Sequence, residues 1–409
     1  RTYVAVDRVR ARGALAAGRQ PRAGSGLIAV RVVHLANFYG PRSGGLRTTM
    51  HRLAAGYAAH GHEVTLVVPT ERHARETRVR TDEAEIIALP SRELPGSGGY
   101  RVITNLTRVR SLLDDLAPDA VEVSDRFTLT SVGDWAQRRG VASAVFSHET
   151  LAGLAAAFGP RFRATTRGVN WWNVRLAARF DHVVATTEFA AREFRAVGAA
   201  NVRIVPLGVD LGAFDPDRFD EGTRRDLTRG AKVLLVHAGR LSPEKRPERS
   251  ILALRLLIHR GVDARLVVAG DGPRRRALER AAAGYPVDFL GFVADRERLA
   301  TILACADVSL APGPLETFCL AALESLASGT PVVASASSAL REVVGDRAGL
   351  VVDDHPSAFA DGIAAQLGRG TAERRREARA RAEQYPWSRT VDAMLALHAA
   401  ATRRQGTAA

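Results

Sequence analysis

"RVVHLANFYGPRSGGLRTTMHRLAAGYAAHGHEVTLVV" spans residues 31–68 and predicts three elements in the order strand, helix, strand. Its first six residues are a largely apolar run of the kind that forms a buried parallel strand. A glycine-rich loop, a helix near residues 45–60 and a second strand within residues 62–69 follow. Because parallel strands joined by helices build doubly wound sheets, this stretch decides the fold class as α/β.

The same alternation runs through both halves of the chain. Further strand-like runs in the first half are EIIAL, DAVEV, ASAVF, HVVAT and VRIVP, with helical stretches between most of them. After residues 206–217 the pattern starts again with AKVLLVHAGR, residues 231–240. We therefore expect two Rossmann-like domains, residues 30–206 and 207–385, that face each other across a cleft.

Length and composition agree with two globular domains. The chain has 409 residues, of which 46% are hydrophobic and 25% charged, so two cores are available. No apolar run approaches the roughly 18 to 20 residues that span a bilayer, and no signal-peptide pattern opens the chain. Cys305 and Cys319 stand in apolar contexts that favour buried thiols over a disulfide. We therefore expect a cytoplasmic protein.

Residues 1–29 begin without Met and are rich in Arg, Ala and Gly, so we expect a disordered or over-extended start.

The charge is strongly positive. The net charge is +14 and comes almost wholly from arginine, because the only lysines are Lys232 and Lys245. A basic surface favours anionic partners such as phosphates, acidic lipid or nucleic acid, without choosing between them. The sequence holds no zinc-finger spacing, helix-turn-helix signature or aromatic RNA-binding motif, so we expect no nucleic-acid partner.

One carboxylate lies just before a predicted helix and another lies within it in GPLETFCLAALESLASGTPVV, residues 313–333. Glu316 lies just before the helix, where the helix dipole alone would favour an acid, and Glu324 lies within it, either buried or facing solvent. Eight residues at a rise of about 1.5 Å place them on the order of 12 Å apart. Glycosidase carboxylates lie roughly 5 to 9.5 Å apart. The spacing therefore favours two carboxylates that bind the two hydroxylated ends of one extended ligand, with an anion at the helix N-terminus between them.

Two cations follow the first strand of the second domain in HAGRLSPEKRP, residues 237–247. Arg240 and Lys245 leave the carboxyl edge of the predicted sheet, where they can neutralise a diphosphate. A solvated basic loop, or pairing of Lys245 with Glu244, are the alternatives. The choice of lysine in a chain that otherwise uses arginine argues for a specific role.

Two features of the first domain lie at the same kind of edge. Gly44 and Gly45 open the first helix and can bring backbone amides against a phosphate, although the loop is neither a Walker loop nor a GxGxxG fingerprint and could be a simple turn. His148 follows the strand in VFSHETLAG, where a ligand role and a hydrogen-bonded structural role are both open.

Two metal-like patterns carry no predicted metal. His60 and His62 in HGHEV lie at the opposite edge of the sheet, so we interpret them as structural. Asp215 and Asp217 form a DxD beside a proline in the linker, without a convergent third ligand. We therefore expect no dedicated metal site and no required cofactor.

The combination of motifs resembles the retaining family 4 glycosyltransferases of GT-B fold, over roughly residues 30–400. The motifs that carry the resemblance are the paired glycines, the strand-end histidine, AGRLSPEK and ETFCLAALE. The resemblance implies that a last helix, residues 386–409, crosses back to the first domain. It also implies a same-face substitution in which the departing phosphate accepts the proton, so that no protein general base is needed.

The resemblance further implies residue roles. Arg240 and Lys245 would hold the nucleotide diphosphate, Glu316 and His148 the donor sugar, and Glu324 the ribose. Other donor-side positions are Gly44, Gly45, Val293 beside the nucleobase, and the amides of Phe318, Cys319 and Leu320. Cys319 departs from the family pattern, in which glycine is commoner.

The opening residues resemble more closely the actinobacterial mannosyltransferases that extend phosphatidylinositol mannosides with GDP-mannose. That narrower resemblance implies a lipid-linked acceptor. Basic and aromatic residues lie together in PRFRATTRGVNWW, residues 160–172, which suits a peripheral contact with an anionic membrane at the inner face of the plasma membrane. A solvated basic face with tryptophans in the core is the alternative. The candidate acceptor-side or membrane-side residues are Tyr39, Arg42, Arg161 and Arg163.

Two other readings of the site stay open at this point. The scaffold could use a UDP-sugar and another glycolipid, a polysaccharide or a small-molecule acceptor. A basic nucleic-acid-binding protein is the non-enzymatic alternative, which the motifs disfavour.

Overall fold

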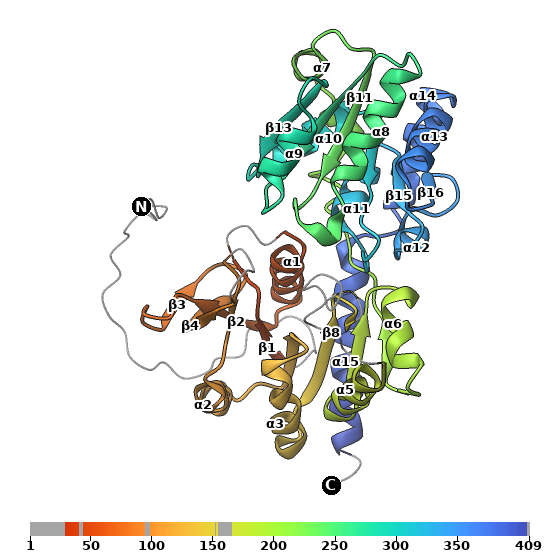
Figure 1. The fold of residues 1–409 in the computed structure, drawn as a ribbon. Helices are drawn as coiled ribbons and strands as arrows, with labels where there is room; N and C mark the ends of the chain where they lie inside the picture. Colours follow the sequence, from red (N-terminus) through yellow and green to blue (C-terminus); the bar gives the residue numbers. More distant parts are fainter. Residues whose placement is uncertain (1–28, 41–43, 95–98, 152, 154–165, 407–409) are drawn as a thin grey trace.

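A computed structural model describes residues 29–40, 44–94, 99–151, 153 and 166–406. Residues 1–28 of the predicted disordered start, and the candidate residues Arg42, Arg161 and Arg163, lie outside these ranges. Figure 1 shows two halves stacked along the long axis of the molecule, with the C-terminal helix running along the N-terminal half. Within the described ranges, no helix is long and apolar enough to cross a bilayer.

The N-terminal half is built on an eight-stranded sheet in the order β10-β9-β8-β7-β1-β2-β4-β3. Its neighbouring strands are parallel except for β3, which runs antiparallel to β4 at the edge. The strands are β1 (Arg31–Ala36), β2 (Glu63–Thr70), β3 (Thr77–Arg80), β4 (Glu85–Pro90), β7 (Ala120–Ser124), β8 (Ala142–Ser147), β9 (His182–Ala185) and β10 (Val202–Ile204), with a separate short pair, β5 (Arg92–Glu93) and β6 (Arg101–Val102). The helices are α1 (Gly45–Ala59), α2 (Leu106–Leu116), α3 (Ser131–Arg139), α5 (Thr166–Arg179) and α6 (Glu188–Arg195).

The C-terminal half has a six-stranded parallel sheet in the order β13-β12-β11-β14-β15-β16, the strand order of a Rossmann fold. The strands are β11 (Val233–Ala238), β12 (Ala264–Ala269), β13 (Val287–Gly291), β14 (Val308–Ala311), β15 (Val332–Ser335) and β16 (Gly349–Val352). The helices are α7 (Glu221–Thr228), α8 (Glu248–His259), α9 (Arg275–Ala281), α10 (Arg296–Cys305), α11 (Leu320–Ala327), α12 (Leu340–Val344), α13 (Pro356–Leu367) and α14 (Thr371–Ala382). The predicted α/β class with two Rossmann-like halves is confirmed.

Each sheet is covered on both faces by an apolar core. Alternate side chains of β1 show why: Val33 and Leu35 enter one core cluster, while Val32 enters the other. In the C-terminal half, Leu234 and Leu235 of β11 are divided between two clusters in the same way. Burial on both faces explains why the parallel strands are apolar runs rather than alternating ones.

The chain crosses between the halves twice, and the two crossings touch. The backbone of Val209 donates to the carbonyl of Tyr385 over 2.8 Å. A Cβ added at Gly208 would lie 2.5 Å from the backbone of Trp387, so only glycine allows this approach. Helix α15 (Trp387–Gly406) starts here and packs on α1 and β8 of the N-terminal half, as Figure 1 shows in blue.

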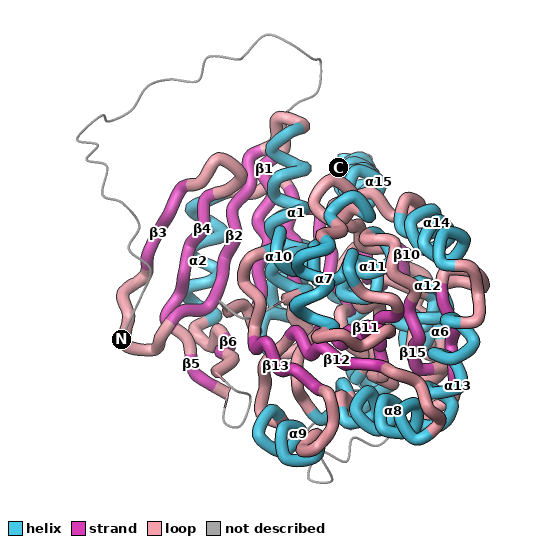
Figure 2. The backbone as a smooth tube through the Cα atoms, turned by 90° about the horizontal axis from the view of Figure 1, so that it is seen from above, coloured by secondary structure: helices cyan, strands magenta, loops and turns pink. Residues whose placement is uncertain are grey.

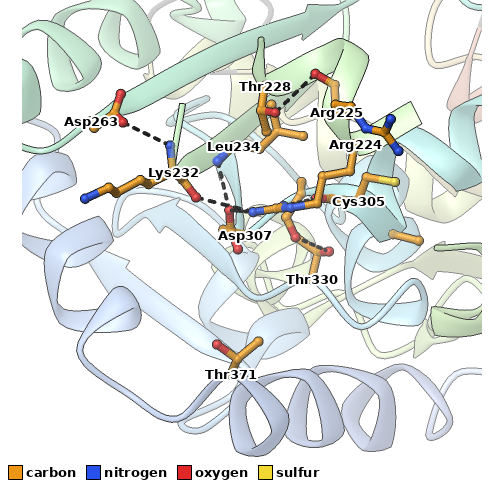
Figure 3. Close-up of polar contacts among 12 residues, drawn as sticks. Arg224, Arg225, Thr228, Lys232, Leu234, Asp263, Cys305, Asp307, Thr330 and Thr371 are labelled. Atoms are coloured by element: carbon orange, nitrogen blue, oxygen red, sulfur yellow. Dashed lines mark hydrogen bonds and ion pairs between the residues drawn. The ribbon is translucent and has the colours of Figure 1, made fainter. Parts of the chain in front are cut away.

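Asp307 organises the amino ends of the C-terminal strands (Figure 3). Its carboxylate accepts hydrogen bonds from the backbone of Leu234 at 2.8 Å and from Arg224 of α7 at 2.9 Å. Arg224 also donates to the carbonyl of Lys232. This network lies at the amino edge of the sheet, so it fixes α7 and leaves the carboxyl edge open for a ligand.

Candidate functional site

Lys245 and Glu316 meet at the carboxyl edge of the C-terminal sheet. They follow β11 and β14, the neighbouring strands at which the order of the sheet reverses, which is where ligands bind in open α/β sheets. Lys245 Nζ donates to Glu316 Oε2 over 2.7 Å, and the Glu316 side chain is only 12% exposed. Lys245 thus pairs with Glu316, and the neighbouring Glu244 accepts a hydrogen bond from Ser242.

The ion pair fixes the charge of Lys245. Burial works against the charged form, but the Glu316 carboxylate outweighs it and raises the pKa of Lys245 above its usual range. A Cβ added at Gly313 would lie 3.1 Å from Glu316 Oε1 and 3.4 Å from Lys245 Cα. The glycine therefore lets the two loops approach closely. Because its pKa is raised, the ammonium group of Lys245 stays charged at physiological pH.

Cys319 takes a left-handed backbone conformation just before α11, with φ 68° and ψ 80°. Glycine adopts this conformation without steric cost, which explains in physical terms why a non-glycine residue is unusual here. Burial, with Glu316 as a second cause, raises the pKa of the Cys319 thiol to about 12, so the thiol stays protonated. The neighbouring Phe318 side chain points into the core and packs edge-on against Tyr385.

Glu324 is buried rather than solvated. It is 9% exposed, and its Oε1 accepts from Arg296 Nη2 over 2.9 Å. Burial raises the pKa of Glu324, while Arg296 acts in the opposite direction. Arg296 in turn lies 4.8 Å over the ring of Phe214. Glu316 and Glu324, the two carboxylates predicted to bind the ligand, therefore lie in separate ion pairs.

The amino ends of α1 and α11 face each other across the two halves. A Cβ added at Gly45, the first residue of α1, would lie 3.8 Å from Leu320 Cδ1 at the first residue of α11. At Gly44, no atom of the described residues, its chain neighbours apart, lies within 4 Å of the corresponding position. Figure 1 shows both helices where the halves meet. Two helix N-termini concentrate partial positive charge there, which favours an anionic ligand.

His148 lies beside the same site. Its carbonyl accepts a hydrogen bond from Thr317, the residue after Glu316. Its Nε2 lies 2.8 Å from Ser124 Oγ, and its ring stacks on Phe146 with centroids 5.4 Å apart. Burial, helped by the nearby His34, lowers the pKa of His148 to about 3, so the imidazole is neutral.

Arg240 faces the other half of the molecule. Its guanidinium carbon lies 4.5 Å from the centroid of the Tyr100 ring, which the N-terminal half contributes. Val293 follows β13 and is half-buried against the core. The sequence motifs did not indicate Tyr100, Thr317 or Arg296. Each joins the site through a contact between distant segments, and no local spacing could have signalled it.

Tyr39 and Trp171, from the predicted acceptor or membrane side, lie in different surroundings. Tyr39 OH lies 2.7 Å from His51 Nε2, and Arg47 lies over the Tyr39 ring. Trp171 on α5 is 57% exposed and has Arg175 4.9 Å from its ring. The alternative that both tryptophans lie in the core is therefore wrong for Trp171.

The metal-like patterns have structural partners. His62 Nδ1 accepts from the backbone of Val30, and His60 Nδ1 lies 2.8 Å from the carbonyl of Gly56. Asp215 caps a short turn and pairs with Arg379. In the described part of the chain, no three His, Cys, Asp or Glu side chains could hold a metal ion together.

Comparison with known proteins assigns the family. Residues 220–385 match the family described as glycosyl transferases group 1, and residues 44–209 match the glycosyl transferase 4-like domain. A GDP-mannose-dependent alpha-(1-6)-phosphatidylinositol dimannoside mannosyltransferase of Mycobacterium tuberculosis is 50% identical, over 90% of this chain and 95% of its own. The chain belongs to the group 1 glycosyltransferases.

More distant relatives of this glycosyltransferase agree with that assignment. A GDP-mannose-dependent alpha-mannosyltransferase of Mycolicibacterium smegmatis is 29% identical, over 85% of this chain and 90% of its own. Two solved structures share the fold. Sucrose-phosphate synthase from Thermosynechococcus elongatus has a TM-score of 0.75 at 19% identity, covering 93% of this chain and 100% of its own. Anabaena HepE, in complex with UDP and glucose, has a TM-score of 0.69 at 18% identity, covering 90% and 98%. The GT-B architecture of the glycosyltransferase is thus shown by its structural neighbours.

Proposed function

We propose that this glycosyltransferase transfers mannose from GDP-mannose, with retention, to a phosphatidylinositol mannoside. The observation that carries the proposal is the 50% identity, over nearly the whole of both chains, to the mycobacterial enzyme with that donor and a dimannoside acceptor. The arrangement of charged groups at the carboxyl edges of both sheets supports it.

The donor diphosphate would lie between the two helix N-termini, beside Arg240 and Lys245. An incoming diphosphate competes with Glu316 for the ammonium group of Lys245, which now lies 2.7 Å from the carboxylate. Once released, Glu316 is an acceptor for sugar hydroxyls. Glu324, which Arg296 holds at 2.9 Å, would accept hydrogen bonds from the ribose hydroxyls.

The chemistry follows from the growth of charge. As the bond between sugar and phosphate breaks, negative charge increases on the diphosphate while the sugar becomes oxocarbenium-like. Preformed cations and helix N-termini therefore stabilise the transition state more than the ground state. His148, neutral because burial lowers its pKa to about 3, contributes a hydrogen bond rather than a transferred proton. The leaving phosphate accepts the proton of the acceptor hydroxyl on the same face of the sugar.

The acceptor would be reached at an anionic membrane surface. The exposed face of α5 presents Trp171 and Val174, and Arg175 lies over the Trp171 ring. Aromatic and aliphatic side chains among arginines suit the boundary between lipid headgroups and acyl chains. The enzyme would therefore act peripherally, at the cytoplasmic face of the plasma membrane.

Mass spectrometry of reaction products tests the proposal. Purified protein is incubated with an extract containing phosphatidylinositol mannosides and, separately, GDP-mannose or UDP-glucose. We expect a mass increase of one hexose on the lipid with GDP-mannose alone. Transfer from UDP-glucose at an equal rate, or transfer only to a soluble acceptor, would overturn it.

A further inference from the structure

Three threonine hydroxyls join the two halves beside the donor site. Thr186 and Thr187 follow β9, and both donate to the backbone carbonyl of Thr317, over 3.1 and 2.8 Å. Thr317 in turn donates from its own hydroxyl to the carbonyl of His148. All three threonines are at most 8% exposed. Because a carbonyl oxygen can only accept, the direction of each of these hydrogen bonds is fixed.

Glu342 makes a second contact between the halves. It lies on α12, and its two carboxylate oxygens accept from the backbone amides of Glu188 and Phe189, each over 2.8 Å. These are the first two amides of α6, and the first four amides of a helix have no partner inside it. A carboxylate of the C-terminal half therefore caps a helix of the N-terminal half, where the helix dipole favours negative charge. Figure 1 shows α12 and α6 on opposite sides of the junction between the halves.

Both contacts hold the backbone around Glu316. Ala339, the residue before α12, donates from its amide to the carbonyl of Glu316 over 2.8 Å. The next carbonyl along the chain, that of Thr317, accepts the two threonine hydroxyls. His148 and Thr186 each follow the end of one of two neighbouring parallel strands, β8 and β9. The loop that carries Glu316 is therefore fixed on one side to α12 and on the other to the strand ends that present His148.

We propose that Thr186, Thr187 and Glu342 are positioning residues for glycosyl transfer, which bring Glu316 and His148 to the same donor sugar. The inference rests on the roles proposed above for Glu316 and His148. The three side chains bond backbone groups, so they act by placing the loop rather than by touching the donor. Each half has its own apolar core. Loss of these contacts should therefore separate His148 from Glu316 while each half keeps its fold.

Hydrogen–deuterium exchange at the amides of Glu188 and Phe189 tests whether the contact forms in solution. The full chain is compared as wild type, Glu342→Ala and Arg341→Ala, with fragmentation that resolves single amides. Arg341 is the exposed neighbour of Glu342 on the same helix, so its variant is the matched control. We expect both amides to exchange about tenfold faster in Glu342→Ala and at the wild-type rate in the control, because exchange requires the hydrogen bond to open. Equal exchange in wild type and Glu342→Ala would overturn the proposal.

Thr186→Val tests whether the two contacts act as a unit. Valine is close to threonine in shape but lacks the hydroxyl, whereas Thr186→Ser keeps it. If the halves dock as a unit, Thr186→Val should speed exchange at the amides of Glu188 and Phe189 about fivefold, and Thr186→Ser should leave it unchanged. Unchanged exchange in Thr186→Val would overturn the proposal.

A kinetic comparison of the same variants separates positioning from simple stability. The donor is whichever sugar nucleotide the product assay shows to be active. Its kcat/KM should fall about fivefold in Glu342→Ala and in Thr186→Val, which is the effect of losing roughly one hydrogen bond, and should stay at the wild-type value in Thr186→Ser and Arg341→Ala. Wild-type kcat/KM in Glu342→Ala or Thr186→Val, or an equal loss in Thr186→Ser, would overturn the proposal.

The exchange measurement needs no donor, and the kinetic one accepts any active sugar nucleotide. Inactivity of the wild type with GDP-mannose would therefore overturn the proposed function alone. The positioning residues would still be decided by their own two measurements.

Discussion

Lys245 and Glu316 form an ion pair, with 2.7 Å between Nζ and Oε2, across two loops that leave neighbouring strands. Each is expected to bind a different part of the donor, and in this structure the two groups compensate each other. The pair keeps two half-buried charges compensated, and we propose that the donor diphosphate and sugar replace it.

Lys245→Ala should lower kcat by about 100- to 1000-fold, because one preorganised donor to the leaving group is lost. Release of GDP, followed at saturating donor, measures the effect. The matched control is Lys232→Ala, which removes the second lysine of the chain from an exposed position. Turnover of Lys245→Ala near that of the control would remove Lys245 from the diphosphate site.

Cys319→Gly should raise the free energy of unfolding by about 0.5 to 1 kcal/mol. Glycine removes the steric cost of the left-handed conformation at φ 68°. This gain is reduced by the larger conformational entropy that glycine loses on folding. Cys319→Ala removes the thiol but keeps the Cβ, so it should give no gain. Urea unfolding of both variants measures the difference in the free energy of unfolding. Equal stability of the two variants would show that backbone strain at Cys319 does not lower the stability of the protein.

His237 should make the fold sensitive to acid. It is 4% exposed, and burial, with Lys245 as a second cause, lowers its pKa to about 4. In the unfolded chain its pKa returns to about 6.5, so below that pH the unfolded state binds a proton that the folded state does not. Stability therefore falls as the pH drops from about 6.5 toward 4.

Urea unfolding at pH 7 and pH 5 measures this loss. The contribution of His237 between these values is about 2 kcal/mol. His237→Asn keeps an amide opposite Ser250 and should reduce the loss by that amount, whereas His259→Asn, at an exposed position, should not. An unchanged loss in His237→Asn would contradict the assignment.

Trp171→Ala should weaken binding to vesicles rich in anionic phospholipid by roughly fivefold, because a large exposed apolar side chain is lost from α5, the helix that we propose contacts the membrane. Vesicle sedimentation measures the bound fraction. Phe219→Ala removes another exposed aromatic residue, which is 43% exposed in the linker to the C-terminal half, and should bind as wild type. Equal binding of the Trp171→Ala and Phe219→Ala variants would place the membrane contact elsewhere.

The order of strands and helices could be predicted from the sequence, because apolar runs and helical periodicity are local. The same reasoning put His148 and Arg240 after strand ends and Glu316 just before a helix. The partners of these residues could not be predicted. Arg240 meets Tyr100 only when the two halves come together, and Ser124 reaches His148 only through the pairing of strands.

Glu324 and Cys319 show what the local pattern leaves undetermined. The sequence left Glu324 either buried or facing solvent, because the cation that pairs with it, Arg296, lies on a different helix. The cysteine was recognised as a departure from the family pattern, while its physical cost became clear only from the backbone angle of 68°.

A crystal structure of the enzyme with GDP-mannose tests the central claim most directly. The measured quantities are the distances from Lys245 Nζ to the diphosphate oxygens and to Glu316. We expect Lys245 to leave Glu316 and lie within hydrogen-bonding distance of a phosphate oxygen, with Glu316 accepting from hydroxyls of mannose. A donor bound away from both side chains, with their ion pair intact, would contradict the account.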